Sequence, residues 1–358
     1  MVDKKFKKEI ITILFICLLW YTASSSNNVV TKVLLSEFPY PMTVTMVQLM
    51  SITIYSGPFF NFWGIRKFVD ISWPYYFKII VPLALGKFMV SVLTHVSIWK
   101  VPISYAHTVK ATMPLFSVVL SRIIIGEKQT YKVYCSLIPI VTGVLIATLT
   151  ELSFDLTGLL SALTATLQMS LQNIFSKKVL QDVGLHHLRL LHILGRLAFF
   201  LFIPIWLYFD FRTILTETVM VIDRKYYIIT LLLADGLLNW LQNIFAFTVM
   251  SMVTSLTFAV ANASKRVFII LCSLFVIGNP VTPLNVFGMM LAIVGVLFYN
   301  KAKYDTLKSD SKKMVLPLVK TSRNENSSYK YHKIDSGNIS NGYVSNGMQK
   351  EIHATNFV

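Results

Sequence analysis

Charged residues are scarce in this sequence. Only 14% of its 358 residues are Asp, Glu, Lys or Arg, whereas 54% are hydrophobic and the mean hydropathy is +0.61. Soluble globular proteins carry roughly 25% charged residues. The three cysteines, Cys17, Cys135 and Cys272, lie in apolar stretches without CxxC spacing. The composition therefore excludes a cytosolic enzyme, a disulfide-rich secreted module and a disordered protein, and the cysteines indicate neither a disulfide framework nor a metal site.

Acidic residues are the scarcer of the charged residues, with 17 Asp and Glu against 33 Lys and Arg, a net charge of +16. Such an excess can indicate a nucleic-acid partner. Here, however, part of the excess lies at the ends of the chain: residues 301–358 hold ten Lys/Arg against five Asp/Glu, and residues 1–9 hold four against two. Most of the other basic residues flank long apolar runs. This distribution is typical of a polytopic membrane protein and argues against nucleic-acid binding.

Ten apolar segments are long enough to cross a hydrocarbon core of ~30 Å, which needs about 20 residues in a helix. They lie near residues 10–35, 41–63, 76–98, 103–125, 131–150, 156–180, 187–209, 226–250, 253–278 and 281–299. The sequence therefore predicts an all-α integral membrane protein with ten transmembrane helices. The expected organisation is a basic N-terminus at 1–9, five-helix halves at 10–150 and 151–300, and a disordered tail at 301–358.

The distribution of Lys and Arg predicts the orientation in the membrane. If the N-terminus is cytosolic, thirteen Lys and Arg outside the tail lie on the cytosolic side and five on the opposite side. We therefore expect both termini to be cytosolic. Residues 10–35 are too long for a signal peptide and lack a small-residue cleavage pattern, and no Arg- and Ser-rich presequence is present. We expect an uncleaved first helix.

The two halves share short patterns. Ile125-Gly126-Glu127 followed by Gly143 recurs as Ile277-Gly278-Asn279 followed by Gly295, with both glycines shifted by 152 positions. With five spans per half, the second half would begin on the opposite side of the membrane from the first. This predicts the inverted-repeat architecture of many secondary transporters, in which the substrate is held near the bilayer midplane between the halves.

Three basic residues lie inside predicted transmembrane helices, where a charge is energetically unfavourable. Lys265 and Arg266 are adjacent, about twelve residues into the ninth segment, and Lys110 lies seven residues into the fourth, followed one turn later by Pro114. A charge at mid-bilayer costs roughly 2.5–3.5 kcal/mol even on insertion scales. Asp235 is the obvious carboxylate that could pair with them. We favour an anion site for a phosphate group, because phosphate oxygens accept charge-assisted hydrogen bonds from Lys and bidentate contacts from Arg.

Other polar residues inside the segments are less specific. Thr94, Gln242 and Asn243 either line the substrate path or join helices through hydrogen bonds. His107, one turn before Lys110, is a further candidate for the site, although a neutral packing histidine is the simpler interpretation. Lys32 lies near a helix end, where its ammonium could reach the bilayer interface. Lys87 is expected to face inward, with no assignable role.

Several motifs together resemble the triose-phosphate/phosphate translocator family of the drug/metabolite transporter superfamily. They are Trp20-Tyr21 with Asn28-x-x-Thr31-Lys32, Phe38-Pro39-Tyr40-Pro41, Ser104-Tyr105-Ala106-His107-Thr108-Val109-Lys110-Ala111 and Lys265-Arg266. His95-Val96-Ser97-Ile98-Trp99-Lys100-Val101-Pro102 and Ser170-Leu171-Gln172-Asn173-Ile174-Phe175-Ser176-Lys177-Lys178 are similar to the orphan subfamily E of solute carrier family 35. The resemblance covers residues 10–303.

The resemblance implies a drug/metabolite transporter fold and exchange of phosphorylated metabolites against phosphate. It places the family's phosphate-binding cations on Lys110, Lys265 and Arg266, and a site threonine on Thr94. The chain departs from the family at three positions. Gln242 stands where plastid members have a substrate-contacting tyrosine, Ser91 replaces a histidine, and Thr31 stands where asparagine is usual.

The leading functional expectation is an antiporter for a phosphorylated organic anion, exchanged for a phosphate compound across an internal membrane of the Golgi or endoplasmic reticulum. We expect no cofactor and no metal, and lipids as the surroundings. The alternatives are a nucleotide-sugar transporter and a transport-inactive membrane scaffold. An enzyme is not expected, because the sequence has no HExxH, GxSxG or P-loop motif. The sequence leaves a monomer and a dimer open.

Overall fold

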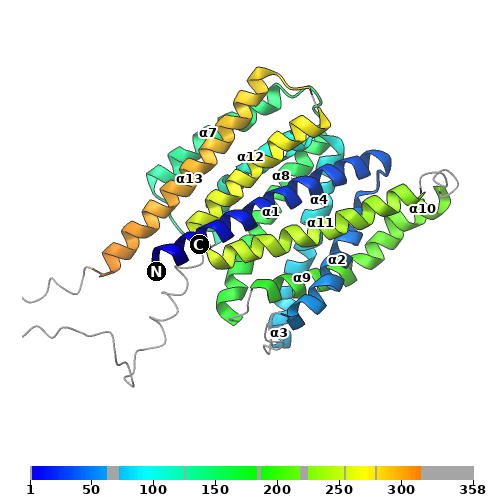
Figure 1. Ribbon diagram of the computed structural model, residues 1–358, viewed down its shortest axis with the longest axis horizontal. Coiled ribbons are helices and arrows are strands. Elements are labelled where there is room, and N and C mark those ends of the chain that lie inside the picture. The colour runs from blue at the N-terminus through cyan, green and yellow to red at the C-terminus, as the bar shows by residue number, and fades with distance from the viewer. Residues whose placement is uncertain are drawn as a thin grey trace, which may run out of the picture.

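The computed structural model describes residues 2–62, 72–124, 126–183, 187–217, 225–253, 255–278 and 280–315. Every regular element within these ranges is helical (Figure 1). In chain order they are α1 (Val2–Glu37), α2 (Pro41–Phe62), α3 (Trp73–Tyr75), η1 (Tyr76–Ile80), α4 (Val81–Lys100), α5 (Ile103–Val109), η2 (Lys110–Thr112), α6 (Met113–Ile124), α7 (Tyr131–Leu149), α8 (Leu156–Val183), α9 (His187–Trp206), η3 (Leu207–Phe211), α10 (Arg212–Glu217), α11 (Lys225–Met252), α12 (Ser255–Ile277) and α13 (Pro283–Val315). The predicted all-α membrane protein is confirmed.

Seven helical stretches within the described ranges are long and apolar enough to cross a membrane. They are Ile10–Glu37, Trp73–Lys100, Tyr131–Leu149, Arg189–Ile214, Tyr226–Ala246, Val260–Ile277 and Pro283–Ser309. The predicted spans at 41–63, 103–125 and 156–180 are also largely helical but are not among these seven. Each contains several Ser, Thr, Gln or other polar residues, which lower its mean hydropathy. The count of ten spans therefore stays a prediction.

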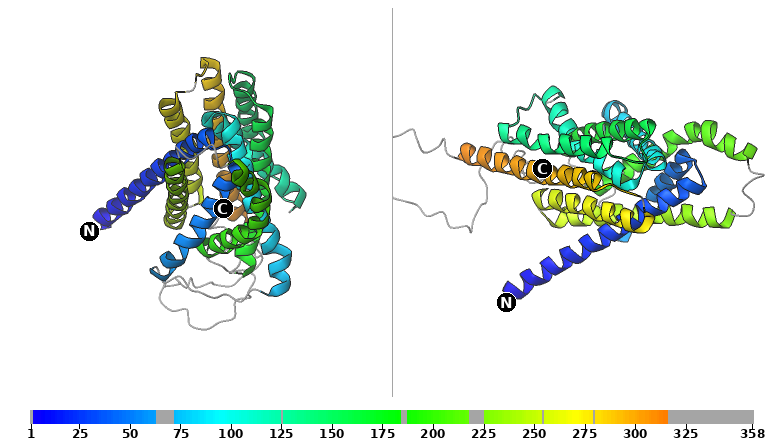
Figure 2. Two further views of the ribbon diagram at one scale, coloured as in Figure 1. Left: turned by 90° about the vertical axis from the view of Figure 1, so that its right-hand side faces the viewer. Right: turned by 90° about the horizontal axis from the view of Figure 1, so that it is seen from above.

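Both ends of the helical body differ from the expected boundaries. Helix α13 continues past Lys301 to Val315, so the first part of the predicted disordered tail is helical, and residues 316–358 lie outside the described residues. Once α13 has formed in the apolar segment, each further residue adds a hydrogen bond without a new nucleation step, so the helix can continue past Lys301. Helix α1 begins at Val2 within the predicted N-terminal segment, and its first part stands away from the other helices (Figure 2). The start of α1 and the end of α13 lie at the same end of the bundle in both figures.

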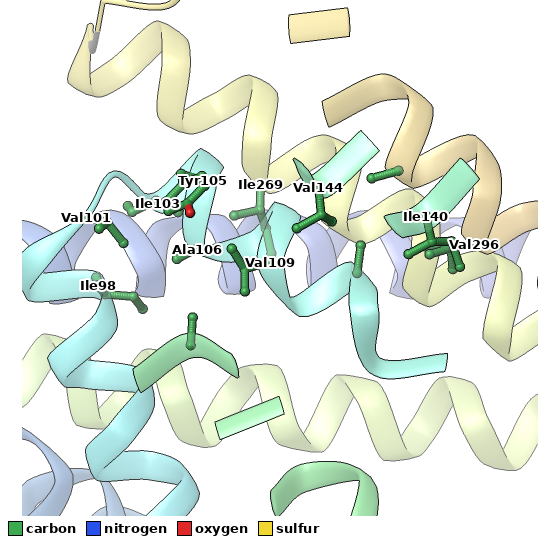
Figure 3. Packing of buried hydrophobic residues seen from close by; sticks show 14 of the residues in the cluster. Ile98, Val101, Ile103, Tyr105, Ala106, Val109, Ile140, Val144, Ile269 and Val296 are labelled. Atoms are coloured by element: carbon green, nitrogen blue, oxygen red, sulfur yellow. The ribbon is translucent and has the colours of Figure 1, made fainter. Parts of the chain in front are cut away.

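The short helix α5 is embedded in the largest hydrophobic cluster. Its residues from Ile103 to Val109 are all buried, and Val109 lies near Ile269 of α12 and Val144 of α7 (Figure 3). Interiors packed at this density resist displacement of their side chains. The cluster therefore fixes the position at which the chain enters η2 with Lys110.

Helices α7 and α13 approach each other through glycines. A Cβ atom on Gly143 would lie 2.4 Å from the Ala292 nitrogen, and one on Gly288 would lie 2.8 Å from the Gly143 oxygen. Small residues allow this close backbone contact, as in many helix pairs inside membranes. Gly295, the predicted counterpart of Gly143, lies in the same interface, where its Cβ would meet the Ile140 nitrogen at 2.8 Å.

The two glycines of the other pair in the predicted repeat share the same backbone conformation. Gly126 and Gly278 have φ of 77° and 68°, the left-handed region in which side chains other than hydrogen are disfavoured. Each comes shortly before the helix, α7 or α13, that completes its half of the chain. The local likeness agrees with a repeat, and the inverted arrangement of the halves stays a prediction.

Lys32 of α1 contacts the end of α4. Its ammonium donates to the carbonyl oxygens of Ile98 at 2.7 Å, Trp99 at 3.1 Å and Val101 at 3.0 Å. These groups lie at the end of α4, where the last carbonyls of a helix lack partners and carry a partial negative charge. Lys32 of α1 is therefore a structural residue that caps α4.

Candidate functional site

A cavity of about 220 Å³ lies between α1, α2, α4, α11 and α12. Two basic side chains, Lys265 of α12 and Lys87 of α4, contribute to its wall. Four carboxamide side chains share the wall: Gln48, Asn239, Gln242 and Asn243. The cavity therefore offers positive charge and many hydrogen-bonding groups to a ligand.

The carboxamides on α11 are held by hydrogen bonds. Gln242 Nε2 donates to Asn239 Oδ1 at 3.0 Å, and Ser24 Oγ of α1 donates to Gln242 Oε1 at 2.8 Å. Asn243 Nδ2 donates to the Asn239 carbonyl at 2.7 Å. Gln242 and Asn243 are both predicted site residues, and both line the cavity. Gln242 also joins α11 to α1.

Lys265 lies between the cavity and α1. Its Nζ is 4.6 Å from the centroid of the Trp20 ring, a cation–π contact with another residue of the cavity wall. Within the described part of the chain, no carboxylate lies within the 4.0 Å of an ion pair with Lys265. The charge of this half-buried lysine is therefore free to be balanced by a ligand.

Arg266 points in another direction, since successive residues of a helix are about 100° apart. Its Nη1 donates to the backbone carbonyl of Lys110 at 2.8 Å, and its Nη2 lies 3.8 Å from the Met113 sulfur. Arg266 thus contacts the backbone of Lys110 and follows Lys265 directly in the chain. The structure thus brings together the three cations that the sequence singled out from two distant segments.

Lys110 and Thr94 are not among the residues that form the cavity wall. Both are half-buried, Lys110 in η2 and Thr94 in α4. His107 is buried, and its Nε2 lies 3.0 Å from Asn28 Oδ1. This contact fits the interpretation of His107 as a packing histidine. A much smaller space of about 10 Å³ lies beside His107 and Arg266.

Asp235, the carboxylate that could have paired with the cations, has other partners. It is completely buried and accepts hydrogen bonds from Thr31 Oγ1 and, at 2.8 Å, from Gln48 Nε2. Among the residues that the structure describes, no Lys or Arg lies within ion-pair distance of this carboxylate. The structure therefore does not place Asp235 against Lys265 or Arg266.

The sequence analysis expected Lys87 to face inward but assigned neither Lys87, Ser91 nor Gln48 to a site, and all three line the cavity. A signal for the first two was present. Lys87, Ser91 and Thr94 are spaced i, i+4 and i+7, so they lie on one face of α4. Gln48 could not be found in this way, because it reaches the cavity from α2 through the tertiary packing alone.

Comparison with known proteins shows the family to which the chain belongs. The model of the Triose-phosphate Transporter family matches residues 11–300. The phosphoenolpyruvate/phosphate translocator 2, chloroplastic, of Arabidopsis thaliana is 33% identical over 82% of this chain and 77% of its own length. The phosphoenolpyruvate/phosphate translocator 1, chloroplastic, of Oryza sativa is 34% identical over 80% of this chain and 70% of its own length.

The glucose-6-phosphate/phosphate translocator 1, chloroplastic, of Arabidopsis thaliana is 28% identical over 79% of this chain and 73% of its own length. These proteins are named as translocators of a phosphorylated compound and phosphate, and the family consists of transporters rather than enzymes. Because the family model spans most of the sequence, this chain belongs to the Triose-phosphate Transporter family.

Proposed function

We propose that the protein is a secondary antiporter that exchanges a small phosphorylated organic anion for a phosphate compound by alternating access. The observation that carries the proposal is the group of half-buried cations without a carboxylate partner among the described residues, of which Lys265 faces the cavity. A buried charge needs compensation, because desolvation costs several kcal/mol. A phosphate dianion supplies it.

Lys110, Lys265 and Arg266 are the proposed phosphate-binding residues. Two ammonium groups and one guanidinium can offer donors to several phosphate oxygens at once. Thr94, Gln242, Asn243 and His107 remain proposed contributors to the rest of the site. Of these, Gln242 and Asn243 have the stronger support, because they line the cavity with Lys265.

The size of the cavity supports a small substrate over a nucleotide sugar. At about 220 Å³ the cavity is smaller than the roughly 300–1,000 Å³ of pockets for drug-sized ligands. A nucleotide sugar would also need room for a base and a second ring. A transport-inactive scaffold is the weaker alternative. In a protein with no anion to bind, apolar residues in place of the three cations would remove the desolvation cost of the charges.

We also propose ten spans in two inverted halves at 10–150 and 151–300, with both termini cytosolic in the Golgi or endoplasmic reticulum. Helix α1 begins and helix α13 ends at the same end of the bundle, which supports an even number of spans. The three relatives above are named as chloroplastic, so a plastid membrane is the location to test against. Accessibility of tags at residues 1 and 358, combined with organelle markers, would decide both points.

The test of the function is exchange by the purified full chain in liposomes that contain phosphate. Labelled phosphate outside should be taken up, and sugar phosphates should compete with it while nucleotide sugars do not. Lys265→Ala should abolish the uptake, whereas Lys100→Ala, a change of an exposed lysine, should not. Uptake that only nucleotide sugars inhibit would replace the proposal with the nucleotide-sugar alternative.

A further inference from the structure

Basic residues gather at one end of the helix pair α7–α13, away from the proposed phosphate site. Residues 122–134, which lead from α6 into α7, and residues 299–308 of α13 hold six Lys and Arg against two Asp and Glu, a net charge of +4. The six basic residues, here called the basic patch, are Arg122, Lys128, Lys132, Lys301, Lys303 and Lys308. Lys303 is half-buried and the other five are exposed. The basic patch is therefore accessible from outside the protein.

The packing of α7 against α13 brings the two parts of the basic patch together. The helices run side by side, and α13 continues beyond the start of α7 (Figure 1). Three contacts define their antiparallel register: Ala147 with Gly288, Ile140 with Gly295, and Thr130 with Thr306, whose hydroxyl oxygens are 2.8 Å apart. In each pair the residue numbers add up to 435 or 436, so Lys132 lies level with Lys303. Arg122 Nη1 donates to the Tyr134 hydroxyl at 3.3 Å, and Tyr134 lies level with Lys301 by the same register.

The positive charge of the basic patch exceeds what the chain itself can balance. Like charges at one level of a helix pair repel each other. Glu127 and Asp305 are the two acidic residues of the same segments, which leaves the net charge of +4. Residues 316–358 hold five Lys and Arg against three Asp and Glu, so the rest of the chain after α13 is basic as well. A second copy of the protein would present the same positive charge. The complementary anion therefore comes from another molecule.

The depth of the basic patch indicates which anion this is. The apolar stretch of α7 begins at Tyr131, which is 81% exposed and lies level with Tyr304 of α13, 42% exposed. Tyrosines are enriched where the hydrocarbon core meets the headgroups. Farther along the pair, Ile138 and Phe298 lie level with each other and are 59% and 57% exposed. The surface thus changes from apolar side chains to tyrosine to lysine, the order of acyl chain, interface and headgroup in a phospholipid.

We propose that the basic patch binds the headgroup of an anionic phospholipid, whose acyl chains lie along the exposed apolar residues of α7 and α13. Ammonium and guanidinium groups donate charge-assisted hydrogen bonds to phosphate oxygens. Clusters of Lys and Arg beside a transmembrane helix attract anionic lipids in this way. The bound headgroup reduces the repulsion between the ends of α7 and α13 and so stabilises the pair. No residue of the basic patch lines the cavity, so this site is separate from the proposed phosphate site.

The test measures lipid binding to the full chain in detergent by native mass spectrometry, with the unfolding temperature as a second readout. Phosphatidylserine should bind more tightly than phosphatidylcholine, whose headgroup has no net charge, and should raise the unfolding temperature further. Lys132→Gln/Lys303→Gln should weaken phosphatidylserine binding about 30-fold, or about fivefold for each lysine, and remove the additional thermal stabilisation. Lys132→Arg/Lys303→Arg should retain both. Lys78→Gln/Lys178→Gln removes two exposed lysines outside the basic patch and serves as the control.

Equal binding of the two lipids by the native protein, or an equal loss in the control variant, would overturn the inference. Displacement of phosphatidylserine by inorganic phosphate would identify free phosphate as the ligand instead, and tighter binding of a polyglutamate peptide would indicate an acidic protein partner. If Lys132→Gln/Lys303→Gln fails to fold, Lys301→Gln/Lys308→Gln tests the same patch at two exposed positions. Lys265→Met should leave lipid binding unchanged, so the outcome is independent of the proposed transport function.

Discussion

The guanidinium of Arg266 donates a hydrogen bond to the backbone carbonyl of Lys110 at 2.8 Å. This carbonyl lacks its usual partner four residues later, because Pro114 has no N–H group. The Met113 amide replaces it in a tighter 3₁₀ turn, and Arg266 supplies the second donor. A helix break in one segment is thus stabilised by a cation 156 positions further along the chain. The same contact joins the two segments that carry the proposed phosphate-binding residues.

Arg266→Lys should therefore weaken both stability and transport, although the charge is kept. A lysine has no planar fork with which to contact the Lys110 carbonyl and a phosphate oxygen together. We expect the free energy of unfolding to fall by about 1.5–3 kcal/mol, the value of a hydrogen bond to a charged group. Thermal unfolding in detergent and phosphate exchange in liposomes are the measurements. Arg122→Lys, a change of an exposed arginine on α6, should alter neither.

Lys265→Met should abolish exchange without loss of stability. The methionine retains an apolar stem beside Trp20 and removes a buried charge that lacks a carboxylate partner within the described ranges. Since desolvation of such a charge is unfavourable, the free energy of unfolding of the empty protein should hold or rise by up to about 2 kcal/mol.

Lys32→Met is the matched comparison for Lys265→Met. It removes three hydrogen bonds at the end of α4 and should lower the free energy of unfolding by at least about 2 kcal/mol. Thermal unfolding of both variants without ligand provides the measurement. Equal losses of several kcal/mol in the two variants would show that Lys265 is a structural residue and would contradict the anion site.

Gly143→Ala should destabilise the pair α7–α13. The added Cβ would lie 2.4 Å from the Ala292 nitrogen, so the backbones must separate. Overpacking of this kind costs about 1–3 kcal/mol. Gly57→Ala is the control, because a Cβ there has nothing within 4 Å and alanine favours a helix. A drop in unfolding temperature confined to Gly143→Ala is expected, and similar temperatures for the two variants would contradict the close packing.

Much of the fold followed from periodicity and composition. The long apolar segments with Pro and Gly at their ends predicted where the helices lie, because a helix must satisfy its backbone hydrogen bonds inside a bilayer. The extension of α13 to Val315 was not expected, since composition alone suggested disorder after Lys301. Helix formation there depends on continuity with the apolar part of α13.

Candidate site residues could be inferred from the sequence where a single residue was anomalous by itself. Lys110, Lys265 and Arg266 stood out because charge in an apolar run is costly. Gln48 and Asn239 did not stand out, because carboxamides occur widely in membrane helices as interhelical partners. Their role depends on which helices meet around the cavity, and Lys32 likewise required the position of α4 to be known.

Asp235→Asn tests whether proton movement takes part in transport. The carboxylate is completely buried and accepts hydrogen bonds from Thr31 and Gln48, the latter a residue of the cavity wall. If the substrate balances the cations, Asp235→Asn should retain exchange within about tenfold, because an amide can replace one of the two acceptors. Exchange that is driven by a pH gradient in the native protein, and lost in this variant, would indicate proton coupling through Asp235.

The last prediction concerns the transport cycle. Alternating access requires the site to be closed from both sides at one stage. An empty closed site would enclose three cations, Lys110, Lys265 and Arg266, with no carboxylate within ion-pair distance in the described structure. At several kcal/mol for each uncompensated charge, this state should be scarcely populated. A phosphate dianion balances about two of these charges, so the loaded carrier should reorient and the empty carrier should not.

Liposomes preloaded with phosphate should therefore take up labelled phosphate at least about tenfold faster than empty ones, which corresponds to a barrier difference of ~1.4 kcal/mol or more. Equal rates into empty and preloaded liposomes would show that the protein is a uniporter.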